Sequence, residues 1–352
     1  MRWTMKVFFL GLALSLADSA FGQGPEYQKQ ESSVPILTGF TGFGTSFQPG
    51  EQHLLPTIAP ILLVPVGNWL LFETEAEFEG DYAHMSGQGW DNSWDKGIEY
   101  IQADVFLNKY VTAVGGRFLT PFGIFNERLH PGWVRNVQTA PWITGFEMTD
   151  SNGIQGRGAA SINRHLTINY AAYYSAASDT DWFLSDRQAG GRLGLFFPEA
   201  RFEVGGTYQR KLIGVRRDLA GVDWTWQLKP IPLDIRGEFA RDPLIGKGYW
   251  IEGAYRMRRV RFLRPFMRKS QADIRFEQFW VSPQIGMAGD MGGMDIPTNN
   301  ASRFFAGWNY WVQKYVRLNF AYGREFNSVD GDHNIWTVGL TYRFAFPLGG
   351  DK

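Results

Sequence analysis

The 352-residue sequence lacks cysteine altogether, which excludes disulfide bridges, thiolate metal sites and cysteine nucleophiles. It also lacks an excess of either charge, because 35 Lys and Arg residues balance 35 Asp and Glu residues. Such a chain offers no broad basic surface, and we expect no nucleic-acid partner. The five His residues show no HExxH spacing and no clustered carboxylates, so we expect no metal and no cofactor.

Long apolar runs are missing as well. A membrane-spanning helix needs about twenty consecutive apolar residues, and no run in this chain is that long. The apolar run 7–17 follows Arg2 and Lys6 and precedes a small-x-small pattern at 20–22. This arrangement predicts a secretory signal peptide over residues 1–22, and therefore an exported protein.

Glycine and aromatic residues are abundant instead, with 41 Gly and 16% aromatic residues beside 20% charged residues. This mixture is expected of short-turned strands that present rings to lipid and charges to water. In the clearest segment, Phe72 and Phe78 lie on one face of a strand. The opposite face carries Glu73, Glu75, Glu77, Glu79 and Asp81. A row of carboxylates needs water, so this strand is predicted to separate an apolar from an aqueous environment.

The same alternation recurs along the chain, and short links alternate with longer ones. The predicted strands are 37–47, 57–64, 69–82, 97–107, 111–119, 153–161, 165–175, 189–197, 201–210, 218–228, 232–241, 248–257, 260–269, 302–311, 315–325 and 333–344. The longest links are 83–96, 120–152, 176–188 and 270–301. Bacterial outer-membrane barrels alternate short periplasmic turns with longer external loops. We therefore predict an all-β fold, a transmembrane antiparallel β-barrel of about 16 strands.

The barrel is expected to span residues 36–344, between a periplasmic N-terminal segment at 23–35 and a periplasmic tail at 345–352. Residues 274–281 have a strand-like pattern, but one more spanning strand would break the alternation of links. We therefore assign 274–281 to a loop. A soluble sandwich or propeller is the alternative, although soluble strands average only about five or six residues.

Charged side chains of both signs occupy the face predicted to point inward, where they would set the selectivity of a pore. The predicted lining residues are Glu73, Glu75, Glu77, Glu79, Gln102, Asp104, Arg117, Arg157, Arg192, Arg236, Arg256, Arg317 and Arg343. Two arrangements remain open at this point. Segregated signs would create a transverse field, whereas intermixed signs would mainly form salt bridges.

Two motifs carry a resemblance to a known family. Residues 116–123 (GRFLTPFG) and 126–131 (NERLHP) resemble the phosphate-selective porin O and P type of sequence, and 263–268 and 306–311 are similar to its closing strands. The resemblance runs from about residue 57 to the C-terminus, and it implies a sixteen-stranded, trimeric outer-membrane channel. The phosphate porins move anions along a ladder of Arg and Lys. This chain departs from that ladder through its acidic residues at 73–81, so phosphate specificity is not carried over.

Segment 120–152 would be the third external loop, which folds inward and narrows the channel in sixteen-stranded porins. Its apolar rings include Phe125, Trp133 and Trp142, which could hold it against the barrel wall. The charged residues predicted to line the constriction are Glu127, Arg128, His130 and Arg135. A loop that stays outside the barrel is the alternative.

The sequence therefore predicts a porin in the bacterial outer membrane that passes small hydrophilic solutes or ions and is not an enzyme. Its expected partners are outer-membrane lipid, lipopolysaccharide and two further copies of itself in a homotrimer. Two other classes stay open. One is a closed structural or adhesive barrel, and the other is a barrel enzyme that uses Ser151 or His130.

Overall fold

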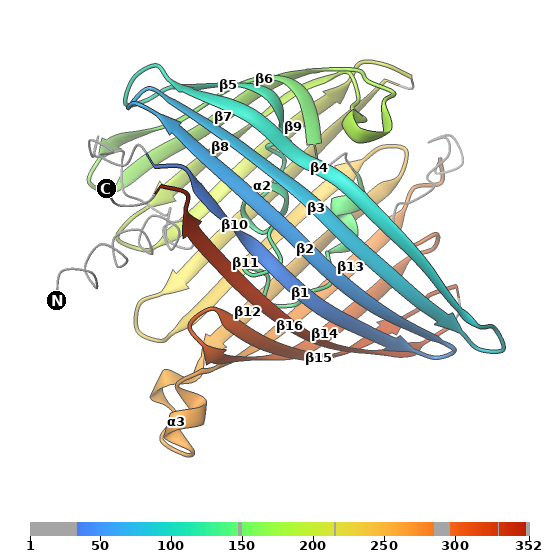
Figure 1. Ribbon diagram of the computed structural model, residues 1–352. Helices are drawn as coiled ribbons and strands as arrows, with labels where there is room; N and C mark the ends of the chain where they lie inside the picture. Colours follow the sequence, from blue (N-terminus) through green and yellow to red (C-terminus); the bar gives the residue numbers. More distant parts are fainter. Residues whose placement is uncertain (1–33, 147–149, 215, 285–295, 330, 350–352) are drawn as a thin grey trace.

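In the described residues, sixteen strands form one closed antiparallel barrel (Figure 1). The computed structural model describes residues 34–146, 150–214, 216–284, 296–329 and 331–349. Each strand pairs with its neighbours in sequence, and β1 closes the barrel against β16. The predicted fold class is confirmed. The predicted signal peptide and nearly all of the predicted segment 23–35 lie outside the described residues.

The strand bounds are as follows. The first eight are β1 (Ile36–Gln48), β2 (Glu51–Val66), β3 (Leu70–Met85), β4 (Trp90–Phe106), β5 (Thr112–Leu119), β6 (Asp150–Asn163), β7 (Leu166–Ala176) and β8 (Gln188–Phe197). The second eight are β9 (Phe202–Lys211), β10 (Arg217–Leu228), β11 (Leu233–Asp242), β12 (Gly246–Arg256), β13 (Ser270–Val281), β14 (Ala301–Gln313), β15 (Val316–Phe326) and β16 (His333–Pro347). The short helical turns are α2 (Phe125–Arg128), η1 (Trp142–Phe146), η2 (Asp181–Phe183), η3 (Met257–Arg259) and α3 (Arg264–Met267).

Large apolar side chains cover the outside of the barrel, because alternate residues of a strand face opposite sides. Examples from around the wall are Phe43, Phe72, Ile101, Ile154, Leu193, Val222, Ile251, Ile274, Phe320 and Val338, all of which are exposed. The alternate positions carry polar groups that are buried inside, such as Gln209 and Arg275. An apolar outer face around a polar interior is the arrangement of a membrane barrel. Among the described residues, no helix is long and apolar enough to cross a membrane.

The thirteenth strand is the main correction to the prediction. The segment 260–269, which we predicted as a strand, lies in a connection that contains η3 and α3, and the strand is Ser270–Val281. Segment 274–281 is therefore part of a spanning strand and not of a loop. Pro265 explains the difference in part, since proline cannot donate a hydrogen bond to a sheet ladder and is well tolerated in the first turn of a helix such as α3. The alternation of links correctly required one strand here, but the sequence pattern selected the wrong segment.

Two boundaries also differ from the prediction. The predicted long link 83–96 is a short turn, because β3 and β4 continue past the other strands and form a hairpin that extends beyond the barrel (Figure 1). At the other end, β16 continues to Pro347, where it still pairs with Ile36 of β1. The first residues of the predicted tail at 345–352 therefore belong to the strand that closes the barrel.

Candidate functional site: the barrel interior and its inner loop

A segment of the loop between β5 and β6 packs against the inside of the barrel. Figure 1 shows α2, which belongs to this segment, within the ring of strands. We call residues 120–146 the inner loop. Seven of its buried apolar side chains form one cluster with Leu219, Ala240, Ile245, Trp250, Phe279 and Ala301, and these seven are Phe122, Ile124, Phe125, Leu129, Trp142, Ile143 and Phe146. This apolar cluster has more members than the one around Val137, and it removes its rings from water.

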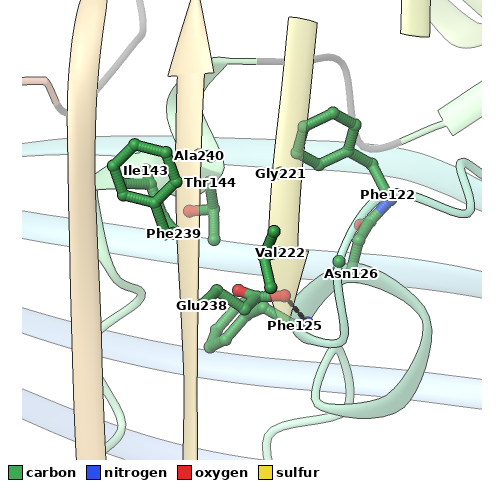
Figure 2. A pocket seen from close by; sticks show the side chains of 11 residues that line it. Phe122, Phe125, Asn126, Ile143, Thr144, Gly221, Val222, Glu238, Phe239 and Ala240 are labelled. Carbon is green, nitrogen blue, oxygen red and sulfur yellow. Dashed lines mark hydrogen bonds between the residues drawn. The ribbon is translucent and has the colours of Figure 1, made fainter. Parts of the chain in front are cut away.

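The start of the inner loop is fixed by hydrogen bonds to β11. The backbone N–H groups of Ile124 and Phe125 both donate to Oε1 of Glu238. The bond from Phe125 is 2.9 Å long and is drawn in Figure 2. The other oxygen of Glu238 accepts a bond of 2.8 Å from the indole of Trp250. Gly123 adopts a positive φ of 63°, and a β-carbon there would overlap the Glu238 carboxylate. Only glycine fits this approach without strain.

The middle of the loop is held by β12 and β15. Arg317 donates two hydrogen bonds of 2.8 Å to the backbone carbonyls of Gly132 and Arg135. Asn136 donates a bond of 2.7 Å to Oε1 of Glu252. Near this point the guanidinium of Arg343 lies 5.4 Å from the ring centre of Trp133. These contacts hold the loop across the interior from several sides.

Charges of opposite sign intermix along much of the inner wall. Ion pairs join Arg157 to Asp104, Arg192 to Glu203 and Asp223, Arg236 to Glu252, Arg303 to Glu277, and Arg217 to Asp242. Most of these side chains are buried. Pairing in a low-dielectric interior is required, because a buried unpaired charge is costly. The sequence left open whether charges of opposite sign are segregated or intermixed. In this part of the wall they are intermixed.

The wall formed by β3 and β4 is acidic instead. The carboxylates of Glu75, Glu77, Glu79 and Glu99 all act on one group of the inner loop, the guanidinium of Arg135. Burial lowers the pKa of Arg135, while these four carboxylates oppose that shift. Since four acidic side chains act on one basic group, this side of the interior has an excess of acidic residues. The signs are segregated here, so the interior contains both arrangements.

Glu99 enters this acidic group because β4 contains a bulge. Glu75 of β3 is opposite Tyr100 of β4, while the next residue, Ala76, is opposite Ile98, which leaves Glu99 as the extra residue. A β-bulge re-aims the side chains near it. The side chain of Glu99 consequently joins that of Glu77, which simple alternation from Tyr100 would not have allowed.

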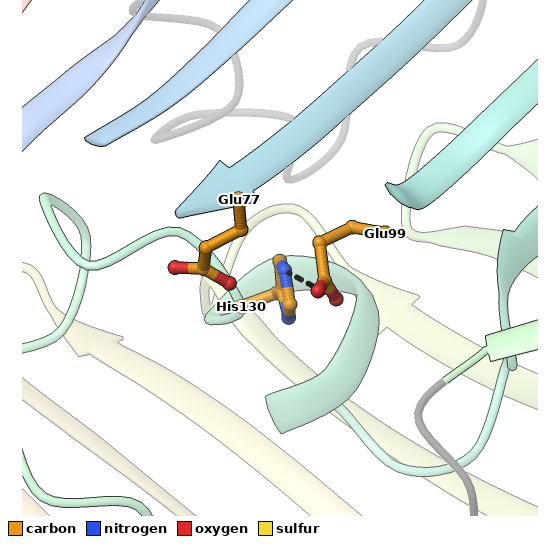
Figure 3. A group of neighbouring side chains, drawn as sticks. All are labelled: Glu77, Glu99 and His130. Atoms are coloured by element: carbon orange, nitrogen blue, oxygen red, sulfur yellow. Dashed lines mark ion pairs between the residues drawn. The ribbon is translucent and has the colours of Figure 1, made fainter. Parts of the chain in front are cut away.

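The imidazole of His130 lies beside these two carboxylates (Figure 3). Its Nε2 is 3.5 Å from Oε2 of Glu99, and the donor atoms of Glu77, Glu99 and His130 lie within 4.8 Å of one another. Burial and the nearby Arg135 lower the pKa of His130 to about 3, so the imidazole is neutral at pH 7. One imidazole and two carboxylates are groups that could hold a cation with a preference for N and O ligands.

Twelve of the thirteen residues predicted to line a pore lie on the inner face of their strands. The prediction is wrong for Arg117, because this residue pairs with the lipid-facing Ile101 of β4 and so lies on the outer face of β5. Arg117 pairs with Asp150 and donates to the carbonyl of Ile98, and Arg256 lies 5.9 Å from the ring of Trp311. Gln102 donates to Asp104 over 2.9 Å. Their role in a pore stays a prediction. Of the four loop residues, Glu127 lies at the limit of hydrogen bonding from Gln155, at 3.5 Å.

Sequence reasoning missed several residues of the interior. The buried carboxylates Glu203, Asp223, Glu238 and Glu252 are partners of the loop and of the inner arginines. Each lies on the polar face of an alternating strand, so the pattern contained the signal. Glu99 is different, since regular alternation places it on the lipid face. A carboxylate facing lipid is itself a sign that a bulge is present.

Comparisons with known proteins show the fold. No family model matches the chain, and no curated protein matches it. Among solved structures, OmpF of Salmonella typhi is 14% identical, with a TM-score of 0.58 over 89% of this chain and 98% of that one. An anion-selective porin of Comamonas acidovorans is 10% identical, with a TM-score of 0.56 over 89% and 100%. The trimer form of OmpT, an outer membrane protein of Vibrio cholerae, is 12% identical, with a TM-score of 0.55 over 88% and 100%.

The protein is thus a membrane-spanning β-barrel with the fold of bacterial outer-membrane porins. The apolar outer face and this fold together give an outer-membrane location. The resemblance to phosphate-selective porins stays a prediction.

Proposed function

We propose that this protein is a porin-type channel without catalytic activity, through which small hydrophilic solutes or ions diffuse passively. The inner loop narrows the lumen, and the acidic wall beside it favours cations. One observation carries the proposal. A loop held inside the barrel presents Arg135 and His130 to a wall that carries four carboxylates. A charged ring at the narrowest part of a pore sets its ion selectivity.

The test is single-channel recording in a planar bilayer, with the reversal potential measured under a salt gradient. Stepwise openings and a reversal potential of the sign for cations are expected. The double variant Glu77→Gln/Glu99→Gln is expected to move the reversal potential toward that of anions. Glu199→Gln is the matched control, because Glu199 is an exposed acidic residue in the turn between β8 and β9. Silence in every insertion would overturn the proposal.

The surroundings of Ser151 do not favour a hydrolase. The hydroxyl of Ser151 is buried and bonds to Thr120 over 2.8 Å and to Gln188 over 3.1 Å. Neither partner is a general base. The single-channel recording also distinguishes the proposed channel from a closed structural barrel, because a closed barrel would conduct no current.

We also propose that the channel assembles as a homotrimer surrounded by outer-membrane lipid and lipopolysaccharide. Support for the trimer comes from OmpT of Vibrio cholerae, whose matching structure is a trimer form. Light scattering on the detergent-solubilised protein measures the mass of the assembly directly.

Phosphate specificity, which the sequence resemblance suggests, is tested by adding phosphate to the planar-bilayer recording. The acidic wall predicts that phosphate does not block the current.

A further inference from the structure

The connection between β12 and β13 is unusually basic. We call residues 257–269 the basic hairpin, which contains η3 and α3. It has no acidic residue, and its cations are Arg258, Arg259, Arg261, Arg264, Arg268 and Lys269, all exposed. Within the described part of the chain, none of these six forms an ion pair with a carboxylate. The hairpin is therefore a concentration of positive charge that the rest of the protein does not neutralise.

The hairpin also exposes apolar side chains. Phe262 is 71% exposed and Leu263 is 58% exposed at its tip. Leu263 adopts a positive φ of 44°, a conformation that is rare and unfavourable for a bulky residue. Backbone strain of this kind is often found where it serves a function. Here it accompanies an exposed apolar tip that water would not favour.

Another apolar residue of the hairpin, Phe266, fixes its position relative to the membrane. Phe266 stacks on Tyr310 and Trp308 of β14, with ring centres 4.8 and 6.0 Å apart. These two rings alternate with the buried Asn309, so they lie on the outer, lipid-facing side of the strand. Tyr and Trp are enriched where a barrel meets the membrane surface. The hairpin therefore packs against the lipid-facing side of the wall.

The hairpin lies at the end of the barrel opposite the long connections β5–β6 and β13–β14. Figure 1 shows α3 projecting beyond the strand ends. In outer-membrane barrels this end faces the periplasm. The cations and the exposed rings are thus at the level of the inner leaflet. Phosphate groups of phospholipids are the anions that the membrane supplies at this level.

We propose that the basic hairpin binds anionic phospholipid headgroups of the periplasmic leaflet. Its arginines bind the headgroup phosphates, since a guanidinium donates paired hydrogen bonds to phosphate oxygens. Phe262 and Leu263 insert between the acyl chains, as apolar residues of interfacial helices do. The proposal rests on the outer-membrane location but not on channel activity.

The test measures lipid binding to the full chain in uncharged detergent. The protein is titrated with phosphatidylglycerol or phosphatidylcholine, and bound lipid is counted by native mass spectrometry. Phosphatidylglycerol is expected to bind more tightly. The variant Arg261→Gln/Arg264→Gln/Arg268→Gln is expected to lose about tenfold or more in affinity for phosphatidylglycerol, with little change for phosphatidylcholine.

A matched control removes the same charge elsewhere at the same end. The variant Lys109→Gln/Arg164→Gln/Lys229→Gln changes cations of three other short turns and should keep the wild-type affinity. Equal losses in the two variants, or none in the hairpin variant, would overturn the proposal. Single-channel conductance of both variants shows whether the barrel is intact. If the hairpin variant shows normal conductance and binds phosphatidylglycerol as tightly as the wild type, the hairpin site is refuted and the channel proposal is unaffected.

Discussion

The guanidinium of Arg128 in the inner loop binds the carboxylate of Glu203 on β9 through two hydrogen bonds of 2.8 and 3.0 Å. Such a two-pronged contact fixes orientation as well as distance. The same carboxylate also accepts bonds from Arg192 and from Asn169. One buried acidic residue of the wall thus connects the loop to two neighbouring strands.

Removal of this contact is expected to loosen the loop. Arg128→Ala leaves Glu203 paired with Arg192, so the barrel should still fold, while the loop loses about 1–3 kcal/mol of stabilisation. We expect a noisier and larger single-channel current, and faster hydrogen exchange in residues 120–146. Arg210→Ala, which removes an exposed ion pair with Asp218, is the control. Identical current records for the two variants would contradict the anchoring role.

The start of the loop offers a test of packing. Gly123→Ala places a methyl group against Glu238 and should displace the loop, at a cost of about 1–3 kcal/mol. Gly214→Ala has a similar positive φ but no neighbour within 4 Å, so it reproduces the backbone strain alone. Thermal unfolding and conductance are measured for both. A Gly123→Ala protein that behaves like Gly214→Ala would show that the contact with Glu238 is unimportant.

The buried arginine of β8 is predicted to matter for folding. Arg192 donates to both oxygens of Asp223, at 2.9 and 2.6 Å. Arg192→Met leaves the fully buried Asp223 without this partner and is expected to cost about 3–5 kcal/mol. The double variant Arg192→Met/Asp223→Leu removes both charges and should recover most of the loss. Unfolding in urea measures each value, and a double variant less stable than the single one would refute this account.

His130 should make stability depend on pH. The unfolded chain binds a proton on this residue below about pH 6.5, whereas the folded protein keeps the imidazole neutral down to about pH 3. The contribution of the neutral His130 to the free energy of unfolding is therefore complete above about pH 6.5 and is lost as the pH falls. Between pH 7.5 and 5.0 the expected loss is about 2 kcal/mol. His130→Gln should lack this part of the pH dependence in urea unfolding, and His165→Gln, in an exposed turn, should retain it.

Much of the barrel could be predicted because its strands follow one rule. Phe72 and Phe78 against Glu73 and Glu75 define the lipid and water faces, and this alternation recurs around the wall. The rule fails for 260–269, where Arg261 and Phe262 alternate in the same way but belong to the basic hairpin. Local alternation cannot distinguish a strand from an interfacial turn, since both place apolar and charged groups on opposite sides.

The interior was harder to predict than the wall. The sequence identified the inner loop and its charged residues, but not their partners. Arg128 binds Glu203, 75 residues away, and Arg317 binds the carbonyl of Gly132, 185 residues away. Such pairs depend on barrel closure and on strand register. Neither is determined by the pattern of a single strand.

The extra residue at Glu99 also reverses the meaning of odd and even positions within β4. On one side of it, Gln102 and Asp104 face inward, and on the other side Asp91 and Asp95 do so, opposite Ala83 and Glu79. Deletion of this single residue would remove the bulge and leave a regular ladder, in which both halves of the strand keep their present faces. If Glu99 were kept but paired as an ordinary residue of the ladder, the two faces of the outer half of β4 would be exchanged and its aspartates would turn outward.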